Sequence, residues 1–228
     1  MIGLGTAINI GLIIAGSLCG LAFGRFMKEN LKQTLMMVSG IIVLLLGMSG
    51  AMQYMLVIVN GTLQTTGPML MIISMVAGAV IGELIDLNRW ITVFGDWVKA
   101  KTGNTGDPQF THAFITASLT FTVGAMGVLG SIQDGLTGNY QTLLLKGILD
   151  GIIVMVMVSS MGKGALFSFI PVGITQWIIT AMAHIAAPLM TPSAIDNLSY
   201  VGSILIFCVG IDLIWPGKIR IANLLPAI

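Results

Sequence analysis

Two long stretches of this chain, residues 33 to 82 and residues 164 to 195, carry no charged side chain. Only 8% of the 228 residues are charged, whereas about 25% are charged in an average soluble domain. A soluble fold of this size could not cover such stretches with its few polar side chains. The chain is therefore predicted to be a multi-pass integral membrane protein. Its formal net charge of +1 gives no indication of a nucleic-acid partner.

Apolar runs long enough to cross a bilayer, about 20 residues each, define the expected helices. The first charge-free stretch must fold back once, at the turn formed by residues 60 to 68, NGTLQTTGP. The sequence thus predicts an all-α bundle of seven spans in a single domain, residues 1–228. The expected spans are residues 2–24, 34–59, 68–85, 109–132, 143–160, 165–189 and 199–215.

Lysine and arginine alternate between the loops, and this alternation predicts the orientation. They follow the first, third, fifth and seventh spans and are missing from the other loops. Lys146, within the fifth span, is the one exception. Because Lys and Arg accumulate on the cytoplasmic side, the N-terminus is expected outside and the C-terminus inside.

Residues 87–101, LNRWITVFGDWVKAK, form an amphipathic segment after the third span. Trp90, Phe94 and Trp97 recur at helical spacing opposite charged residues. We expect a helix lying in the inner membrane interface as an anchor, in preference to a partner-binding site.

Small residues recur every four positions in two spans. The first span carries Gly16, Gly20 and Gly24, and the third carries Ser74, Gly78 and Gly82. Such ladders let helix backbones approach closely, either within the fold or between protomers, so a homodimer is expected. VSGIIVLLLG in the second span and VGSILIFCVG in the seventh also suggest an inverted repeat, which favours a transporter.

The segment TFTVGAMGVLGSIQDGL, residues 120 to 136, carries several glycines, which have no side chain, in the outer half of the fourth span. One interpretation is a groove for a neighbouring helix. The other is a helix unwound from Gly124 through Gly127 to Gly130, whose bare backbone lines a polar cavity. Thr122 would add a hydroxyl on the approach to this cavity.

Asp150 lies within the fifth span, and a carboxylate in a membrane is a functional-site hypothesis by default. An ion pair with Lys146, four residues earlier, is the alternative explanation. Asn9 is expected at a similar depth in the first span. The predicted outer site thus comprises Asn9, Gln133, Asp134 and Asp150 together with the Gly-rich segment.

A second polar cluster is expected toward the cytoplasm, formed by Glu83, Lys163, Gln176 and Asp212, in which Glu83 and Lys163 would neutralise each other. Cys19 and Cys208 sit in apolar runs and indicate neither a disulfide nor a metal site. No zinc, haem or other cofactor is expected. Because HExxH and Ser–His–Asp patterns are missing, enzyme activity is not expected either.

Six motifs together resemble a known family: IGLGTAIN, GELIDLN, GAMGVLGSIQDGLTGN, LLKGILDGI, SSMGKGALFSFIPV and RIANLLPAI. The chain resembles the YqgA/YdfK-like bacterial inner-membrane proteins, a domain of unknown function. The resemblance spans essentially the whole chain. It implies a small multi-pass protein of the bacterial cytoplasmic membrane, in contact with the lipid bilayer.

These observations lead to an expected function and an alternative. The first is a membrane transporter of a small solute or ion, coupled to protons or sodium, with its polar site at broken helices. The alternative is a non-transporting assembly or signalling partner that uses the glycine ladders. A membrane enzyme ranks third.

Overall fold

The computed structural model of the chain is mostly helical and describes residues 1–24, 26–122, 125–186, 188 and 191–228. In chain order its elements are α1 (Leu4–Gly24), α2 (Glu29–Met55), β1 (Leu56–Val59), β2 (Thr62–Thr65), α3 (Pro68–Ile85), α4 (Leu87–Lys101), α5 (Phe110–Thr122), α6 (Ala125–Thr137), α7 (Gln141–Met161), η1 (Lys163–Ser168), α8 (Phe169–Ala181), α9 (Ala183–Ala186), α10 (Pro192–Ile214) and η3 (Ile221–Ala227).

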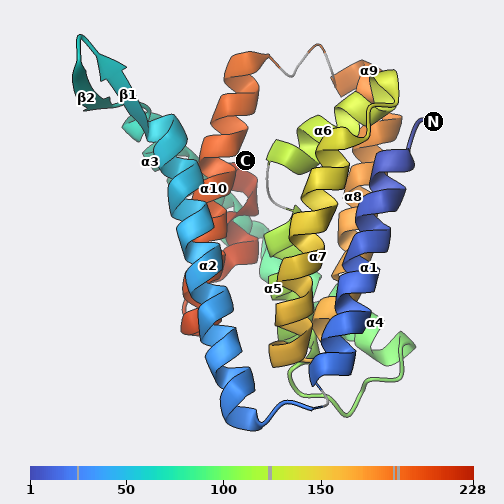
Figure 1. Ribbon diagram of the computed structural model, residues 1–228. Helices are drawn as coiled ribbons and strands as arrows, with labels where there is room; N and C mark the ends of the chain where they lie inside the picture. The colour runs from blue at the N-terminus through green and yellow to red at the C-terminus, as the bar shows by residue number, and fades with distance from the viewer. Residues whose placement is uncertain (25, 123–124, 187, 189–190) are drawn as a thin grey trace.

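Within the described residues, six helical segments are long and apolar enough to cross a membrane. A seventh span arises if α5 and α6, which are bent by 60° at a short break, are counted together. The prediction of a multi-pass helical membrane protein with an interrupted span is therefore confirmed. The hairpin, α6, α9 and the N-terminus lie at one end of the bundle, hereafter the hairpin end, and α4 lies toward the opposite end, the α4 end (Figure 1).

A β-hairpin replaces the end of the second predicted span and the turn that follows it. Helix α2 stops at Met55, four residues before the predicted end, and β1 pairs antiparallel with β2. Asn60 and Gly61, with φ of 51° and 78°, make the two-residue connection. Left-handed dihedrals at both turn residues match the twist of a hairpin, so Asn-Gly here favours strands over a longer helix. The expectation of a purely α-helical chain is wrong to this extent.

The glycine ladder of α1 packs against α7, which runs parallel to it along the bundle (Figure 1). A Cβ atom added to Gly16 or Gly20 would overlap the backbone carbonyl of Gly151 or Met155 on α7. Close backbone approach of this kind supplies dispersion contacts that lipid cannot replace. The ladder in α1 is thus a packing surface within the fold.

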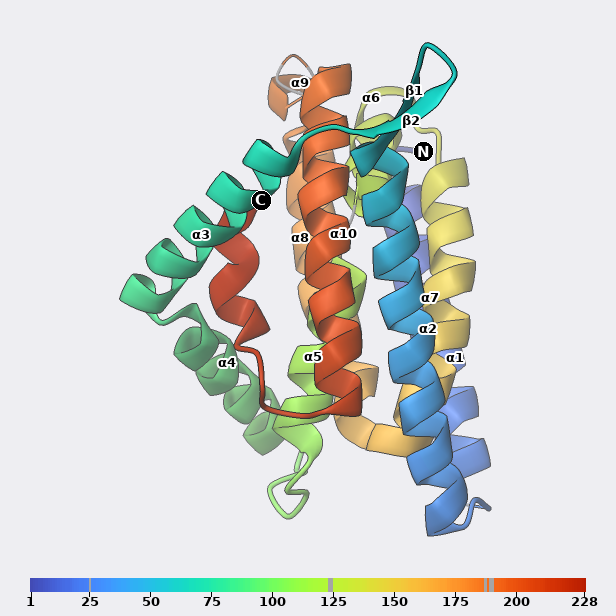
Figure 2. The same ribbon diagram turned by 90° about the vertical axis from the view of Figure 1, so that its left-hand side faces the viewer.

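The ladder of α3 has the same role with a different partner. Gly82 and Gly78 face Asn223 and Ala227 of η3, and a Cβ at either glycine would collide with their backbone. Figure 2 shows η3 lying alongside α3, in the angle between α3 and α4. Because both ladders are occupied within one chain, they do not support the expected homodimer.

Helices α2 and α10 form an antiparallel pair whose contacts are reciprocal (Figure 2). A Cβ at Gly47 would meet the backbone of Phe207, and a Cβ at Gly210 would meet the backbone of Leu44. These are equivalent positions of the two similar segments VSGIIVLLLG and VGSILIFCVG. The two segments therefore contact each other as two halves related by a local two-fold axis would.

Helix α4 forms over the predicted residues. Gly95 and Val98 are buried on the side facing α5, where Phe94 also packs against Phe114. Trp90 and Trp97 are exposed on the other side.

Four other boundaries differ from the prediction by five or more residues. Helix α2 begins at Glu29, not at residue 34, and α6 continues to Thr137, beyond residue 132. Helix α8 ends at Ala181, before residue 189, and α10 begins at Pro192, ahead of residue 199.

Replacing Gly16 by alanine tests the packing of α1 on α7. Gly16→Ala is expected to lower the thermal unfolding midpoint in detergent, because overpacking a tight contact costs about 1–3 kcal/mol. Gly11→Ala in the same helix is the matched control, since nothing lies within 4 Å of its added Cβ. Equal effects of the two changes would contradict the packing role.

Candidate functional site

The most unusual polar feature of the bundle is an ion pair between Lys146 and Asp150 on α7. Both side chains are only 9% exposed. Asp150 is the tenth of the 21 residues of α7, so it lies near the middle of this span. The one-turn spacing predicted the pair, and it is formed.

Three other elements border this ion pair, and two of them supply polar side chains. Asn9 of α1 is fully buried and approaches Asp150, although its amide makes no hydrogen bond of ordinary geometry. Gly127 of α6 faces the aliphatic end of Lys146, whose Cε would lie 3.3 Å from an added Cβ. The amide nitrogen of Gln176, on α8, would lie 3.8 Å from the same Cβ. Residues far apart in sequence thus converge on the pair.

A cavity of about 340 Å³ borders the ion pair on the side away from α1. It lies among α2, α5, α6, α7 and α10, and we call it the first cavity. Its polar lining comprises Gln53, Tyr54, Thr120, Lys146, Asp150, Ser199 and Ser203. Val43, Phe121, Met126 and Ile206 contribute to its apolar walls. A small solute with both polar and apolar parts would match such a lining.

The described part of the segment predicted to be unwound is helical. Helix α6 is regular from Ala125 onward, so Gly127 and Gly130 are helical and the prediction that they are unwound is wrong. Gly124 lies outside the described residues. At Gly127 the missing side chain makes room for Lys146, and at Gly130 it makes room for Leu143. Thr122, the last residue of α5, has a buried hydroxyl without a partner in the described structure.

Two residues of the predicted outer site lie apart from the ion pair. Asp134 is fully buried, and its Oδ2 accepts hydrogen bonds from the backbone nitrogens of Gly5 at 3.0 Å and Thr6 at 3.4 Å. It therefore caps the first turn of α1, where a negative charge is also favoured by the helix dipole. Gln133 accepts a hydrogen bond of 2.7 Å from the hydroxyl of Thr142.

The second predicted cluster is dispersed. Glu83 pairs with Arg220 at 3.1 Å, so the predicted Glu83–Lys163 pair is wrong. Lys163 instead lines a separate cavity of about 400 Å³ together with Asp107 and Ser159. Gln176 belongs to the surroundings of the Lys146–Asp150 pair. The prediction grouped Gln176 with Glu83, Lys163 and Asp212, whereas Gln176 lies near Gly127 of α6.

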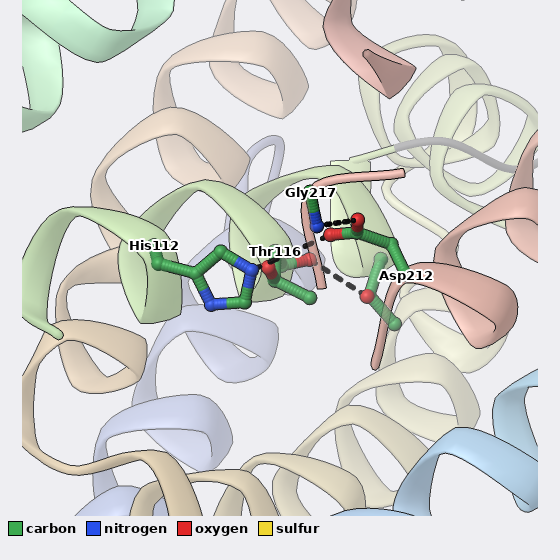
Figure 3. A network of polar contacts seen from close by, with 5 residues as sticks. His112, Thr116, Asp212 and Gly217 are labelled. Carbon is green, nitrogen blue, oxygen red and sulfur yellow. Dashed lines mark hydrogen bonds and ion pairs between the residues drawn. The ribbon is translucent and has the colours of Figure 1, made fainter. Parts of the chain in front are cut away.

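Asp212 has a partner that the sequence did not indicate. Its Oδ2 lies 3.4 Å from Nε2 of His112 on α5, and its Oδ1 accepts a 2.8 Å hydrogen bond from the backbone nitrogen of Gly217 (Figure 3). The two side chains come from helices 100 positions apart in sequence, which no local pattern reveals. Among the described residues, no group of three or more His, Cys, Asp or Glu side chains is arranged to hold a metal ion.

Comparison with known proteins gives matches over nearly the whole chain. The family model described as "Protein of unknown function (DUF554)" matches residues 4–228. "Uncharacterized membrane protein YdfK" of Bacillus subtilis (strain 168) is 28% identical over 98% of this chain and 92% of its own length. "Uncharacterized protein YqgA" of Escherichia coli (strain K12) is 24% identical over 99% of this chain and 93% of its own length. No solved structure matches the chain.

Neutralising the ion pair tests its contribution to folding. Lys146→Met and Asp150→Leu are each expected to lower stability by about 3–5 kcal/mol, because each leaves an uncompensated buried charge, and the double variant should recover most of the loss. The midpoint of thermal unfolding in detergent measures this. Glu83→Gln is the control, since an exposed pair contributes about 0–1 kcal/mol. Additive losses at Lys146 and Asp150 would contradict the pairing.

Proposed function

The chain belongs to the DUF554 family, and we propose that it transports a small solute or ion across the bacterial cytoplasmic membrane. The observation that carries this proposal is the Lys146–Asp150 ion pair, buried near the middle of α7 and open to the first cavity. Transporters bind their substrates near the membrane midplane, where helices are interrupted. The break between α5 and α6 lies beside this cavity, since Thr120 and Gly127 line it from either side.

Energetics favour a functional role for the pair. Two charges removed from water lose more solvation than they regain by attraction, unless further hydrogen bonds support them. A well-packed apolar pair of similar volume is often equally stable or more stable. The nearby Gln176 carries a buried amide oxygen that has no partner among the described residues. An arrangement this costly is typical of a site that binds something else for part of its cycle.

The geometry supports an exchange of partners at Asp150. The ammonium group of Lys146 occupies the place beside the carboxylate that a solute cation, a sodium ion or a proton would take. When such a ligand binds Asp150, Lys146 is free to contact the anionic part of a solute or the coupling counter-ion. The first turn of α6 also borders the cavity through Met126 and Gly127. Its backbone N–H groups have no acceptor within the helix and so favour a negative group.

The alternative function is that of a non-transporting assembly or signalling partner. One observation favours it: α3 is the least buried of the candidate spans, and its exposed face is apolar over Met69, Ile72, Ile73, Val76 and Val80, with the exposed Glu83 near the end of the helix. Lipid covers such a face equally well. A stable complex with a second protein on α3, together with the absence of any ligand effect at Asp150, would favour this alternative.

Ligand-dependent stability tests the transport proposal. The purified protein is heated in detergent with sodium, lithium or potassium chloride, the common amino acids or short carboxylic acids. We expect at least one compound to raise the unfolding midpoint, because binding to the folded state adds RT ln(1 + [L]/Kd) to the free energy of unfolding, about 2.7 kcal/mol at 100 times Kd. The same compound should then move through proteoliposomes containing the native protein.

The Lys146→Met/Asp150→Leu double variant provides the decisive control, because it is expected to fold without the charges. It should show neither the ligand effect nor flux. Retention of both would mean that the pair is structural and that the proposed site is wrong. A panel in which no compound stabilises the native protein would also contradict the proposal.

The proposal includes an orientation: because of the alternation of Lys and Arg, the hairpin end is outside, and α4 and the segment after α10, which carries Lys218 and Arg220, are at the cytoplasmic face. From there η3 returns along α3, so the end of the chain lies away from the α4 end (Figure 2). In a Cys19→Ser/Cys208→Ser background, Thr62→Cys should react with an impermeant maleimide on intact cells, whereas Lys101→Cys should react only after lysis. Both native positions are exposed in the structure. The reverse labelling pattern would invert the orientation.

A further inference from the structure

We propose that His112 and Asp212 form a proton-binding site in a second cavity, and that its protonation holds that cavity closed. This inference deepens the proposed transport function and rests on it, since it names the proton as a ligand that controls access from the α4 end. The second cavity has a volume of about 390 Å³ and lies among α4, α5, the end of α10 and the segment leading into η3.

The contact between His112 and Asp212 is close but incomplete. The side chain of Asp212 is 9% exposed and that of His112 is 40% exposed, yet the Nε2 atom of His112 is buried. This atom lies 3.4 Å from the carboxylate without forming a hydrogen bond of ordinary geometry (Figure 3). A neutral imidazole has one N–H and one acceptor nitrogen, whereas the protonated ring donates from both. Protonation therefore guarantees a charged donor facing Asp212.

Besides the pair itself, Arg220 is the charged side chain among the described residues that line the cavity, and Lys218, between the lining residues Gly217 and Ile219, is exposed. Arg220, from the segment before η3, pairs with Glu83 of α3. Asp96 of α4 accepts a 2.6 Å hydrogen bond from the hydroxyl of Thr111. The α4 side chains that line the cavity, Asn88 and Thr92, are uncharged. The response of this site to pH thus depends mainly on the His112–Asp212 pair.

The position of the pair connects it to the first cavity. Helices α5 and α10 line both cavities: His112, Thr116 and Leu119 face the second, and Thr120 faces the first. On α10, Ile206 lines the first cavity and Asp212 the second, about 9 Å farther along the helix. Val209, between them on α10, is fully buried. A bond from α5 to α10 at His112 therefore holds together the two helices that separate the cavities.

The direction of the effect follows from charge. Imidazoles ordinarily change charge between about pH 5 and pH 8. When the ring of His112 is protonated, its charge attracts Asp212 and keeps α5 against α10. When the ring is neutral, this attraction is lost and the helices can separate at the α4 end. Proton release from His112 would then favour a state in which the second cavity is open, as population shift requires.

The test measures how fast N-ethylmaleimide labels Leu119→Cys in a Cys19→Ser/Cys208→Ser background in detergent. Leu119 lines the second cavity and is 5% exposed, so labelling reports opening. Each rate is divided by that of the same cysteine in a His112→Gln protein at the same pH, which cancels the ordinary pH dependence of the thiol. We expect a ratio near one at about pH 8 and a reduction of about fivefold or more at about pH 5.5.

Two further variants complete the test. The labelling rate in an Asp212→Asn protein, divided by the rate in the His112→Gln protein at the same pH, should be near one at every pH, because the carboxylate is gone. His184→Gln changes the other histidine of the chain and should keep the native response. A pH-independent ratio in the native background, or a pH-dependent ratio that remains in Asp212→Asn, would overturn the proposal. No solute is used, so failure here leaves transport at Asp150 standing, and failure of the ligand test leaves this measurement interpretable.

Discussion

The close contact of α1 with α7 determines where the buried charges of this protein lie. In lipid, helices gain nothing from leaving water, so close backbone approach is a main source of attraction between them. Gly16 and Gly20 of α1 rest on the backbone of α7, and Gly147 and Gly151 of α7 receive α1 in turn. Gly147 lies between Lys146 and Asp150 in sequence, and its missing side chain admits Asn9. The packing that joins the two helices therefore also places an amide beside the ion pair.

Most polar side chains of the bundle are satisfied locally, and this sets the exceptions apart. The hydroxyls of Ser118, Thr120, Ser131, Ser199 and Ser203 each donate to the backbone carbonyl four residues earlier. Such bonds satisfy a hydroxyl within its own helix and need no functional explanation. A carboxylate, an ammonium or an imidazole has no such local solution. The Lys146–Asp150 pair, formed within α7, and the His112–Asp212 contact, formed between α5 and α10, therefore stand out as charged side chains that need another side chain as a partner.

Local patterns predicted the features of this protein that depend on local chemistry. The apolar runs predicted the spans, the four-residue ladders predicted close packing, and the spacing of Lys146 and Asp150 predicted their ion pair. The dispersed cluster failed because the facing of Gln176 depends on how α8 rotates against α6. The unwound segment failed because Gly127 and Gly130 make room for neighbouring side chains while remaining helical. The capping role of Asp134 and the pairing of His112 join distant segments, so only the fold reveals them.

The interrupted span gives the two cavities a common mechanical element. Its first half, α5, packs chiefly against η1 and α4, whereas its second half, α6, packs against α8, α7 and α9. A change in the angle between these halves would alter the lining of the first cavity without breaking the contacts of both. Because α5 also borders the second cavity, the same change would reach His112. Discrete packing arrangements, rather than continuous deformation, transmit effects between distant sites. A bent span held by separate neighbours is therefore a suitable link between the proposed proton binding at one end and the proposed solute binding near the middle.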